Sequence, residues 1–479
     1  MENKLWINGQ WVDSVNGKTM NVENPATGEI LGQVVNACSE DVNLAVKGAK
    51  EAFYDGRWSQ ATSQTRFQVM MKMADLMEAR SEEIARIESE DTGKPYEYLS
   101  LGGDIPFAID NMRYFASVAR DTSGSRSGEY APGLTSIFRH EPCGVTAGIS
   151  PWNYPFLMAI WKIGPPLVAG CTSIIKPASI TPRSTLFLGE IAKEAGLPDG
   201  VLNILTGNVG KDLVAHPDIR MVSLTGATDT GKMIMRGAAD SLKRVHLELG
   251  GKAPLIAFAD ADVDKIVEKV ILGGFCNTGQ DCTAVTRVLV EKSIVNRVTE
   301  AIVEAAKAVI VGDPFDKNTE VGPMVSAAQR ESVMGFVERA KVSGATVLTG
   351  GKIPEGFEKG YYYEPTVITN VDQKSEIVQK EVFGPVITIQ SFDGEEEGLT
   401  MGNDVDFGLA ASVFTKDVGR AMRMANRLEF GTVWVNDHLI LASEGPHGGF
   451  KQSGFGKDMS VESVHDYQVT KHIMISLDK

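Results

Sequence analysis

The segment Phe275–Ala284, with sequence FCNTGQDCTA, places a cysteine at the end of a glycine-containing turn and before the apolar run Val288–Val290. Gly279 would allow the backbone to approach whatever Cys282 reacts with. A thiol attacks as its thiolate, so a nucleophilic Cys282 predicts surroundings that lower the thiol pKa. The cysteine alone leaves the question open, because most cysteines of this kind are small core residues.

Two further segments contain residues that acyl chemistry needs. His246–Pro254, HLELGGKAP, puts Glu248 at the end of an apolar run and before two glycines, which suits a half-buried general base. Ile149–Pro155, ISPWNYP, offers the side-chain amide of Asn153 in a turn. A nucleophile, a base and an oxyanion donor together indicate catalysis through a thioester.

These segments and Lys380–Pro385, KEVFGP, stand in an order and at spacings that resemble the aldehyde dehydrogenase superfamily. The resemblance runs from Leu5 to Tyr467, and within the superfamily the chain is most similar to γ-aminobutyraldehyde dehydrogenases, near betaine aldehyde dehydrogenases. It implies an α/β fold of two domains with parallel sheets, plus a small β oligomerisation element. The cofactor expected from the resemblance is NAD, with NADP also accepted.

Composition limits the classes of partner and compartment. With 479 residues we expect two or three domains, and a net charge of −15 argues against nucleic acid or an anionic membrane as a partner. Five scattered cysteines favour reduced thiols in the cytoplasm. No apolar run reaches the roughly 18 residues of a membrane span. Without H-x-x-x-H or C-x-x-C spacing we expect no metal site.

Strand-like and helical runs alternate from Cys143 onward, which predicts parallel sheets with helices on both faces. We predict a cofactor-binding domain from residues 1–123 and 143–250, and a catalytic domain from 251–463. Residues 124–142 and 464–479 form the oligomerisation hairpin and tail, which in the family pair across subunits to build dimers and tetramers. Glu248 and Cys282 fall in different domains, so the active site should lie between them.

The cofactor site is not marked by a G-x-G-x-x-G motif. Leu224–Gly231 instead predicts a strand, a glycine turn and a helix start, where backbone N–H groups can hold a pyrophosphate, although such a turn favours glycine in any case. By resemblance the cofactor lies across this turn. The resemblance implies that the cofactor-binding residues are Ile149, Ser150, Trp152, Asn153, Lys176, Ser179, Gly207, Gly210, Thr225, Gly226, Ala227, Leu249, Glu381 and Phe383.

Cofactor preference depends on Ser179, which by resemblance sits beside Lys176 at the adenosine ribose. Many NAD-preferring relatives have a glutamate at this position, which would repel a 2′-phosphate. The serine removes that repulsion, so we expect NADP to be accepted.

The resemblance also implies a mechanism. Cys282 attacks the aldehyde carbon, the oxyanion forms near the amide of Asn153 and the backbone N–H of Cys282, and Glu248 activates the water that hydrolyses the thioester. Lys162 matches a family lysine near the base, where it could relay protons. Two alternatives come from other functional classes of protein. One is a thiol acyltransferase without redox chemistry, and the other is a non-catalytic structural or binding protein.

The substrate is predicted from the residues around the nucleophile. Cys276 stands where, by resemblance, succinic semialdehyde dehydrogenases carry arginine and betaine aldehyde dehydrogenases carry tryptophan. Tyr154 and Trp161, seven residues apart, could form two aromatic walls for an ammonium group, although core packing would also explain Trp161.

Negative potential at the entrance of the site could come from Asp104, Asp110 and Asp281, for which solvated or capping roles are the alternative. We therefore expect an ω-aminoaldehyde such as 4-aminobutanal, with betaine aldehyde or a neutral aliphatic or aromatic aldehyde as alternatives.

Overall fold

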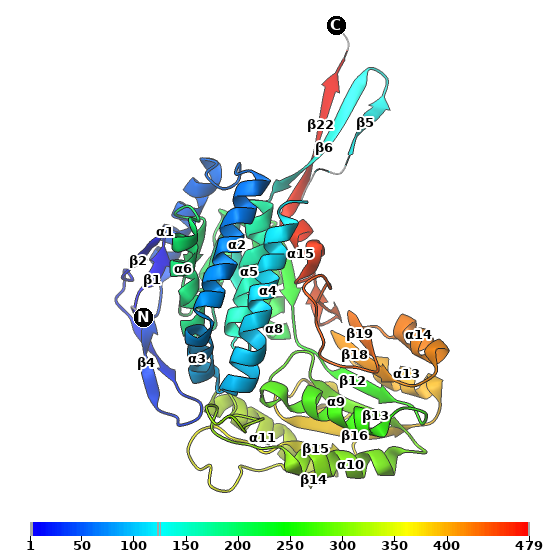
Figure 1. Cartoon of the computed structure of the whole chain (residues 1–479). Coiled ribbons are helices and arrows are strands. Elements are labelled where there is room, and N and C mark those ends of the chain that lie inside the picture. Colours follow the sequence, from blue (N-terminus) through cyan, green and yellow to red (C-terminus); the bar gives the residue numbers. More distant parts are fainter. Residues whose placement is uncertain (1–2, 122–123, 125, 478–479) are drawn as a thin grey trace.

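The computed structural model describes residues 3–121, 124 and 126–477. The predicted domain ranges include a few residues that lie outside this description, namely 1–2, 122–123, 125 and 478–479. Two large sheets, each covered by helices, make up the body, and a narrow arm projects from it (Figure 1). In the described part of the chain, no helix is long and apolar enough to cross a membrane.

The first sheet has eight strands in the order β2-β1-β9-β8-β7-β10-β11-β21. Its five central strands are parallel, and β1, β2 and β21 are antiparallel additions at the edges. The bounds are β1 Leu5–Ile7, β2 Gln10–Val12, β7 Val145–Ile149, β8 Thr172–Lys176, β9 Leu202–Ile204, β10 Ile219–Thr225, β11 Arg244–Glu248 and β21 Gly454–Phe455. A separate hairpin joins β3 Thr19–Glu23 and β4 Ile30–Val35.

Helix α5, Pro155–Ala169, is the buried centre of one face of this sheet. Every one of its residues is buried, as expected for a helix that is apolar all round. It starts at a proline in the first turn and ends at Gly170, which has a left-handed φ of 91°. The helices packed with it are α2 Ser63–Ala79, α3 Ser81–Thr92, the π-helix η1 Tyr96–Asp104, α4 Ile105–Val118 and α6 Arg183–Ala195, while α1 Ser39–Tyr54, α7 Gly210–Ala215 and α8 Thr228–Ala239 cover the opposite face.

The second sheet has seven strands in the order β14-β15-β16-β13-β12-β18-β19, all parallel except β14. Adjacent residues of its strands point to opposite faces: Leu255 packs with α9 and α10, and Ile256 with α13 and α14. The strands are β12 Ala253–Ala257, β13 Val285–Glu291, β14 Thr346–Thr349, β15 Thr366–Thr369, β16 Val386–Phe392, β18 Ala410–Phe414 and β19 Thr432–Val435. The helices are α9 Val263–Phe275, α10 Val295–Ala308, α11 Ala327–Val342, α12 Glu376–Gln379, α13 Glu395–Asn403 and α14 Val418–Arg427.

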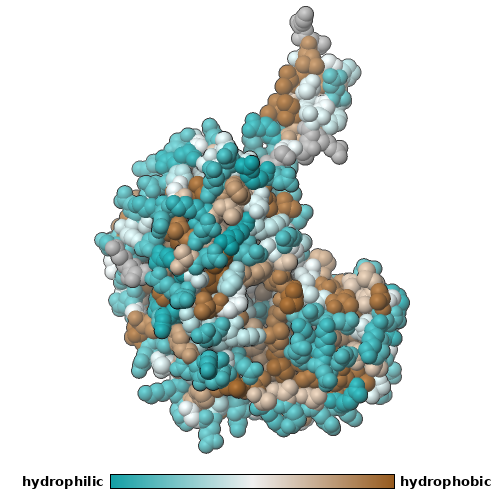
Figure 2. All heavy atoms as spheres, in the orientation of Figure 1, coloured by the Kyte–Doolittle hydropathy of each residue, from teal (hydrophilic) through white to brown (hydrophobic). Residues whose placement is uncertain are grey.

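The arm is a three-stranded antiparallel sheet of β5 Arg126–Ala131, β6 Leu134–Pro142 and β22 Gln468–Ser476. The predicted hairpin and tail therefore pair with each other inside one chain, from Gln468 opposite Pro142 to Ser476 opposite Leu134. Apolar side chains are exposed along β22, including Val469, Met474 and Ile475 (Figure 2). Exposed apolar surface of this kind is typical of a protein interface.

The predicted domain boundaries stay a prediction, and two segments near the end of the chain bear on them. β21, which falls within 251–463, pairs with β11 of the first sheet. The helix α15, Ser460–Asp466, packs against α5 of the same unit. The short strands β17 Phe407–Gly408 and β20 Phe450–Lys451 pair with each other between these regions. The chain thus returns from the second sheet to the first before it enters the arm.

Candidate active site

A cavity of 260 Å³ lies between the carboxyl ends of the first sheet and loops of the second. It brings together three of the four predicted catalytic side chains, Cys282, Glu248 and Asn153. The other lining residues come from the same predicted segments, with two additions from α11: Pro151, Trp152, Tyr154, Met158, Thr225, Gly226, Ala227, Leu249, Gly250, Gln329, Ser332, Glu381, Val382 and Phe383.

The loop before Cys282 has an unusual backbone. Asn277, Thr278 and Gly279 all have left-handed φ values, of 49°, 58° and 66°, in the short 3-10 helix η2, Cys276–Gly279. A β-branched residue rarely adopts this conformation, so surrounding contacts must hold it. The Asn277 amide donates hydrogen bonds to the carbonyl oxygens of Asn153 (2.9 Å) and Gln280 (3.2 Å) and so ties this loop to the one that carries Asn153.

Gly279 allows a close approach between two backbone segments. A Cβ at this position would collide with the backbone of Gly384 and Pro385. The approach of a reactant that was expected at Gly279 stays a prediction. A Cβ at Gly251 would likewise collide with the carbonyl oxygen of Cys282. These glycines therefore allow backbone segments to pack closely around the nucleophile.

The surroundings of Cys282 raise the pKa of its thiol well above the usual value. Burial is the largest cause, followed by the negative charges of Glu248, Asp281 and Glu381. The expectation of surroundings that lower this pKa is therefore wrong for the protein alone. Attack by Cys282 requires that a base take its proton.

Glu248 ends β11 and points into the cavity with 1% of its surface exposed. Among the described residues, neither carboxylate oxygen has a hydrogen-bond partner. A ring nitrogen of His447, Nε2, lies 3.5 Å from Oε1. Sequence reasoning missed His447, whose only local signal is a polar side chain between Pro446 and two glycines.

Asn153 is buried beside the nucleophile, as an oxyanion donor would need to be. Its side-chain amide donates one hydrogen bond, of 3.0 Å, to the carbonyl oxygen of Gln280. An amide carries two N–H donors, so this contact fixes the orientation of the group and leaves a second donor.

Lys162 does not line the cavity but lies beneath it on α5. Its Nζ atom is 2.7 Å from Oδ2 of Asp458, and the pair is buried. His246 is 3.2 Å from the other oxygen of Asp458. Although burial raises the pKa of the Asp458 carboxyl, the charges of Lys162 and His246 hold it well below its usual range. Asp458 was missed because its only sequence signal is a carboxylate in a glycine-rich loop.

Seven predicted cofactor residues besides Asn153 line the cavity. Thr225, Gly226 and Ala227 connect β10 to the N-terminus of α8, and the rings of Trp152 and Phe383 pack edge to face at 5.2 Å. Leu249 and Glu381 complete this set. Oε1 of Glu381 accepts a hydrogen bond of 2.9 Å from the backbone N–H of Gly251, and burial raises the pKa of its carboxyl to about 7.

The other predicted cofactor residues lie outside this cavity, at the carboxyl ends of neighbouring strands: Ile149, Ser150, Lys176, Ser179, Gly207 and Gly210. The buried Lys176 ammonium donates a hydrogen bond to the carbonyl oxygen of Pro177 (2.9 Å), and burial lowers its pKa to about 8. The Ser179 hydroxyl donates to Oδ1 of Asn208 (3.0 Å). Gly207 has a left-handed φ of 98° and leaves no room for a Cβ beside Asn36.

The predicted substrate residues are held by polar partners of the protein. The Tyr154 hydroxyl donates to Asp281 (2.7 Å), and the indole N–H of Trp161 donates to Asn111. Asp110 accepts a hydrogen bond from the Ser443 hydroxyl. The ring of Trp161 lies 5.5 Å from that of His447, close to Glu248.

A buried lysine that the sequence did not indicate, Lys94, contacts both Asp104 and Tyr154. Nζ of Lys94 is 2.6 Å from Asp104 and 3.2 Å from Glu88. The same ammonium group lies 4.3 Å from the centre of the Tyr154 ring. One face of Tyr154 is thus already occupied by a cation of the protein, so only its other face could serve as the aromatic wall that the sequence suggested.

Cys276 borders a different hollow, of 550 Å³, whose other lining residues include Tyr98, Leu272 and Phe275. Burial raises the pKa of the Cys276 thiol to about 12, and the charges of Asp281 and Asp104 add to the rise. The ammonium of Lys94, which is paired with Asp104, opposes this rise.

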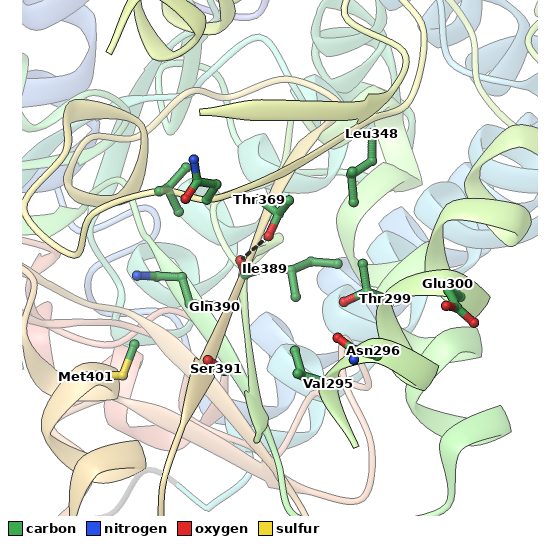
Figure 3. A pocket seen from close by; sticks show the side chains of 12 residues that line it. Val295, Asn296, Thr299, Glu300, Leu348, Thr369, Ile389, Gln390, Ser391 and Met401 are labelled. Carbon is green, nitrogen blue, oxygen red and sulfur yellow. Dashed lines mark hydrogen bonds between the residues drawn. The ribbon is translucent and has the colours of Figure 1, made fainter. Parts of the chain in front are cut away.

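A hollow of 530 Å³ between α10 and β16 lies in the second unit, away from these residues (Figure 3). Its lining includes Asn296, Glu300 and Gln390, and Thr369 donates a hydrogen bond of 3.4 Å to the carbonyl oxygen of Ile389. It contains none of the predicted site residues. The smaller cavity at Cys282 is the candidate active site because the reactive groups converge there.

Known proteins resemble the chain over its whole length. The aldehyde dehydrogenase family matches residues 11–473. The putative aldehyde dehydrogenase DhaS of Bacillus subtilis is 40% identical over 481 residues, covering 99% of this chain and 96% of the relative. Aldehyde dehydrogenase family 2 member C4 of Arabidopsis thaliana is 40% identical over 478 residues, covering 99% of this chain and 95% of the relative.

Solved structures agree with these relatives. A betaine aldehyde dehydrogenase from Staphylococcus aureus in complex with NAD+ is 39% identical and covers 100% of this chain and 96% of its own, with a TM-score of 0.98. A point mutant of an aldehyde dehydrogenase from Bacillus cereus is 40% identical and covers 100% of this chain and 97% of its own, with a TM-score of 0.97. The predicted fold class and the predicted resemblance are confirmed. The chain therefore belongs to the aldehyde dehydrogenase family of oxidoreductases.

Proposed function

We propose that the chain oxidises an aldehyde to a carboxylate through a thioester on Cys282, with NAD as the preferred cofactor and NADP accepted. The observation that carries the proposal is the meeting of Cys282, Glu248 and Asn153 in one cavity between the two sheets. Cys282 adds to the aldehyde carbon, and its proton passes to a neighbouring base. The free N–H of Asn153 stabilises the oxyanion, and Glu248 removes a proton from the water that hydrolyses the thioester.

The residues of the cavity fit a nicotinamide dinucleotide. The turn Thr225–Ala227 lines the cavity and leads into the N-terminus of α8, which suits a pyrophosphate, and the buried carboxylate of Glu381 suits the hydroxyl groups of a ribose. Trp152 and Phe383 offer apolar surface to the nicotinamide end. When bound, the dinucleotide accepts the hydride that leaves the aldehyde carbon. The related S. aureus structure in complex with NAD+ supports this choice.

For the substrate we propose an ω-aminoaldehyde such as 4-aminobutanal. The support is that Asp281 and Asp110 accept hydrogen bonds from uncharged donors, the hydroxyls of Tyr154 and Ser443, and that Tyr154 lines the cavity. The positive charge of Lys94 is paired with two carboxylates, Glu88 and Asp104, and not with Asp281 or Asp110. Betaine aldehyde is the second candidate, supported by the names of the related solved structures, and neutral aliphatic or aromatic aldehydes are the third.

The test is to compare kcat/KM for 4-aminobutanal, betaine aldehyde, succinic semialdehyde and hexanal, with reduced-nicotinamide absorbance as the signal. Cys282→Ala provides the baseline for each substrate. We expect 4-aminobutanal to be preferred, and the preference to shrink in Asp281→Asn, which removes the charge that lies against Tyr154 of the cavity wall. A clear preference for hexanal or succinic semialdehyde would contradict the proposed substrate and leave the proposed reaction intact.

We further propose that the protein is a cytoplasmic homo-oligomer, a dimer or tetramer, with aldehydes and not nucleic acid or membranes as its partners. The five free cysteines are consistent with a reducing compartment, and the exposed apolar side chains of β22 suit contact with another copy of the chain. Light scattering of the full chain, compared with a variant that carries Met474→Glu and Ile475→Glu, tests the role of this surface. An unchanged mass in the variant would exclude β22 from the interface.

A further inference from the structure

Three metal-ligating side chains meet in the active-site cavity. Sγ of Cys282, a carboxylate oxygen of Glu248 and a ring nitrogen of His447 all lie within 4.8 Å of one another. They come from three separate segments, namely the loop before β13, the end of β11 and the loop before β20. The prediction of no metal site relied on short local spacings, which cannot reveal ligands brought together from distant segments.

The polar atoms of this group lack other partners. Among the described residues, no hydrogen bond reaches either carboxylate oxygen of Glu248 or Nδ1 of His447, and each residue is 1% exposed. Buried polar atoms without partners are costly, so a bound cation would recover part of this cost. The unpaired atoms are thus a second observation, independent of the short distances, that points to a ligand.

The donor set fits zinc. Thiolate, imidazole and carboxylate are the ligands of Zn²⁺ in proteins, and its bond lengths imply ligand atoms about 3.3–3.6 Å apart in a tetrahedron. Nε2 of His447 is already 3.5 Å from Oε1 of Glu248. Sγ of Cys282 lies within 4.8 Å of both atoms, and the cavity that the three residues border leaves space for a fourth ligand.

His447 is held firmly enough to act as a ligand. Its backbone N–H donates to the carbonyl oxygen of Asp458 (2.9 Å), and the Asp458 N–H donates back to the His447 carbonyl (2.7 Å). Its ring lies 5.5 Å from that of Trp161. These contacts hold the segment and its ring in the free protein, which reduces the entropy cost of metal binding.

We propose that Cys282, Glu248 and His447 form a binding site for one Zn²⁺ ion, and that the bound ion inhibits the enzyme reversibly. Zinc would occupy the nucleophile and the base together, so the metal-bound protein can neither form nor hydrolyse a thioester. The metal site does not depend on which aldehyde is the substrate. It rests on the proposed reaction only for its inhibitory effect.

Direct binding is measured first, on the cofactor-free protein, by titration with Zn²⁺ and separately with Co²⁺. We expect one ion per chain and a near-ultraviolet charge-transfer absorption of Co²⁺ bound to a thiolate. His447→Phe keeps a ring against Trp161 and should weaken binding at least about tenfold, because losing even an outer-shell partner of a metal typically costs about 10–100-fold in affinity. Cys282→Ser should remove the charge-transfer absorption, and the control Cys171→Ser should change nothing.

A second measurement needs no activity from the variants. Zn²⁺ should slow alkylation of Cys282 by iodoacetamide in the wild type, followed by peptide mass spectrometry, and have little effect in His447→Phe. In the wild type, chelation by EDTA should restore both alkylation and aldehyde oxidation. Equal Zn²⁺ affinity in wild type and His447→Phe, or cobalt–thiolate absorption that persists in Cys282→Ser, would overturn the proposal. Zinc binding without inhibition would retain the site and reject its inhibitory role.

Discussion

The ammonium group of Lys94 lies 4.3 Å from the centre of the Tyr154 ring, within the distance of a cation–π contact. The same group forms buried ion pairs with Glu88 and Asp104. Because Tyr154 lines the active-site cavity, this contact links a buried charge cluster to the wall of the site.

Replacing Lys94 by methionine should destabilise the protein strongly. The substitution leaves two carboxylates buried without a cation, and breaking a buried pair costs about 3–5 kcal/mol. Thermal unfolding measured by circular dichroism should show a lowered midpoint. Adding Asp104→Asn and Glu88→Gln to Lys94→Met should recover much of the loss, whereas a midpoint equal to wild type in the single variant would contradict this account.

The three residues of the proposed chemistry should fail in different ways. Cys282→Ala should abolish oxidation and keep cofactor binding, because only the nucleophile is lost. Glu248→Gln should slow hydrolysis of the thioester and leave a burst of reduced cofactor. Asn153→Ala should lose on the order of 10²–10³ in turnover, as removal of an oxyanion donor does. Stopped-flow absorbance separates the burst from the steady state, and steady turnover in Cys282→Ala would refute the assignment.

Asp281→Asn should make Cys282 more reactive. The charge of Asp281 is one of the causes that raise the pKa of the Cys282 thiol, so its removal lowers that pKa and increases the thiolate fraction at a fixed pH. Alkylation by iodoacetamide at pH 8 should become several-fold faster, by roughly the amount that a fraction of a pKa unit gives. Asp110→Asn is the matched control and should leave the rate unchanged.

The use of NADP should depend on pH through Lys176. Burial lowers the pKa of its ammonium to about 8, so the group is charged below that pH and neutral above it. Its attraction for a 2′-phosphate is therefore present at pH 7 and declines by pH 9. We expect the ratio of kcat/KM for NADP to that for NAD to fall over this range in the wild type.

Lys176→Arg keeps its charge at both pH values and should show a flatter ratio. A second variant, Ser179→Glu, should depress NADP use at every pH because it introduces a negative charge beside the ribose. No detectable NADP turnover in the wild type at saturating aldehyde would show that this pair does not accommodate the phosphate.

The sequence predicted the regular parts of the molecule. Strand and helix alternation located β10 and α8 and the glycine turn between them, because period and turn chemistry are local properties. The arm strands β6 and β22 were predicted because neither had a partner in a neighbouring βα unit. Cys282, Glu248 and Asn153 were found through three short segments, and the structure brings all three to one cavity.

What the sequence could not supply depends on packing between distant segments. His447 and Asp458 reach the site from the glycine-rich stretch near the end of the chain, and Lys94 precedes a π-helix; none follows a period that points to the cavity. The raised pKa of the Cys282 thiol depends on carboxylates from separate segments, Glu248 and Glu381. The role of Gly279 became clear only once the backbone of Gly384 was placed beside it.

The pairing of β6 with β22 also constrains the order of events during translation. Leu134–Pro142 leaves the ribosome long before Gln468–Ser476, the strand it pairs with along its whole length. Asp458 and His447, which complete the surroundings of the nucleophile, are likewise synthesised close to the end of the chain. A nascent chain can therefore pair strands β1 to β11 of its first sheet, without the edge strand β21, while its arm and its catalytic pocket both remain unfinished.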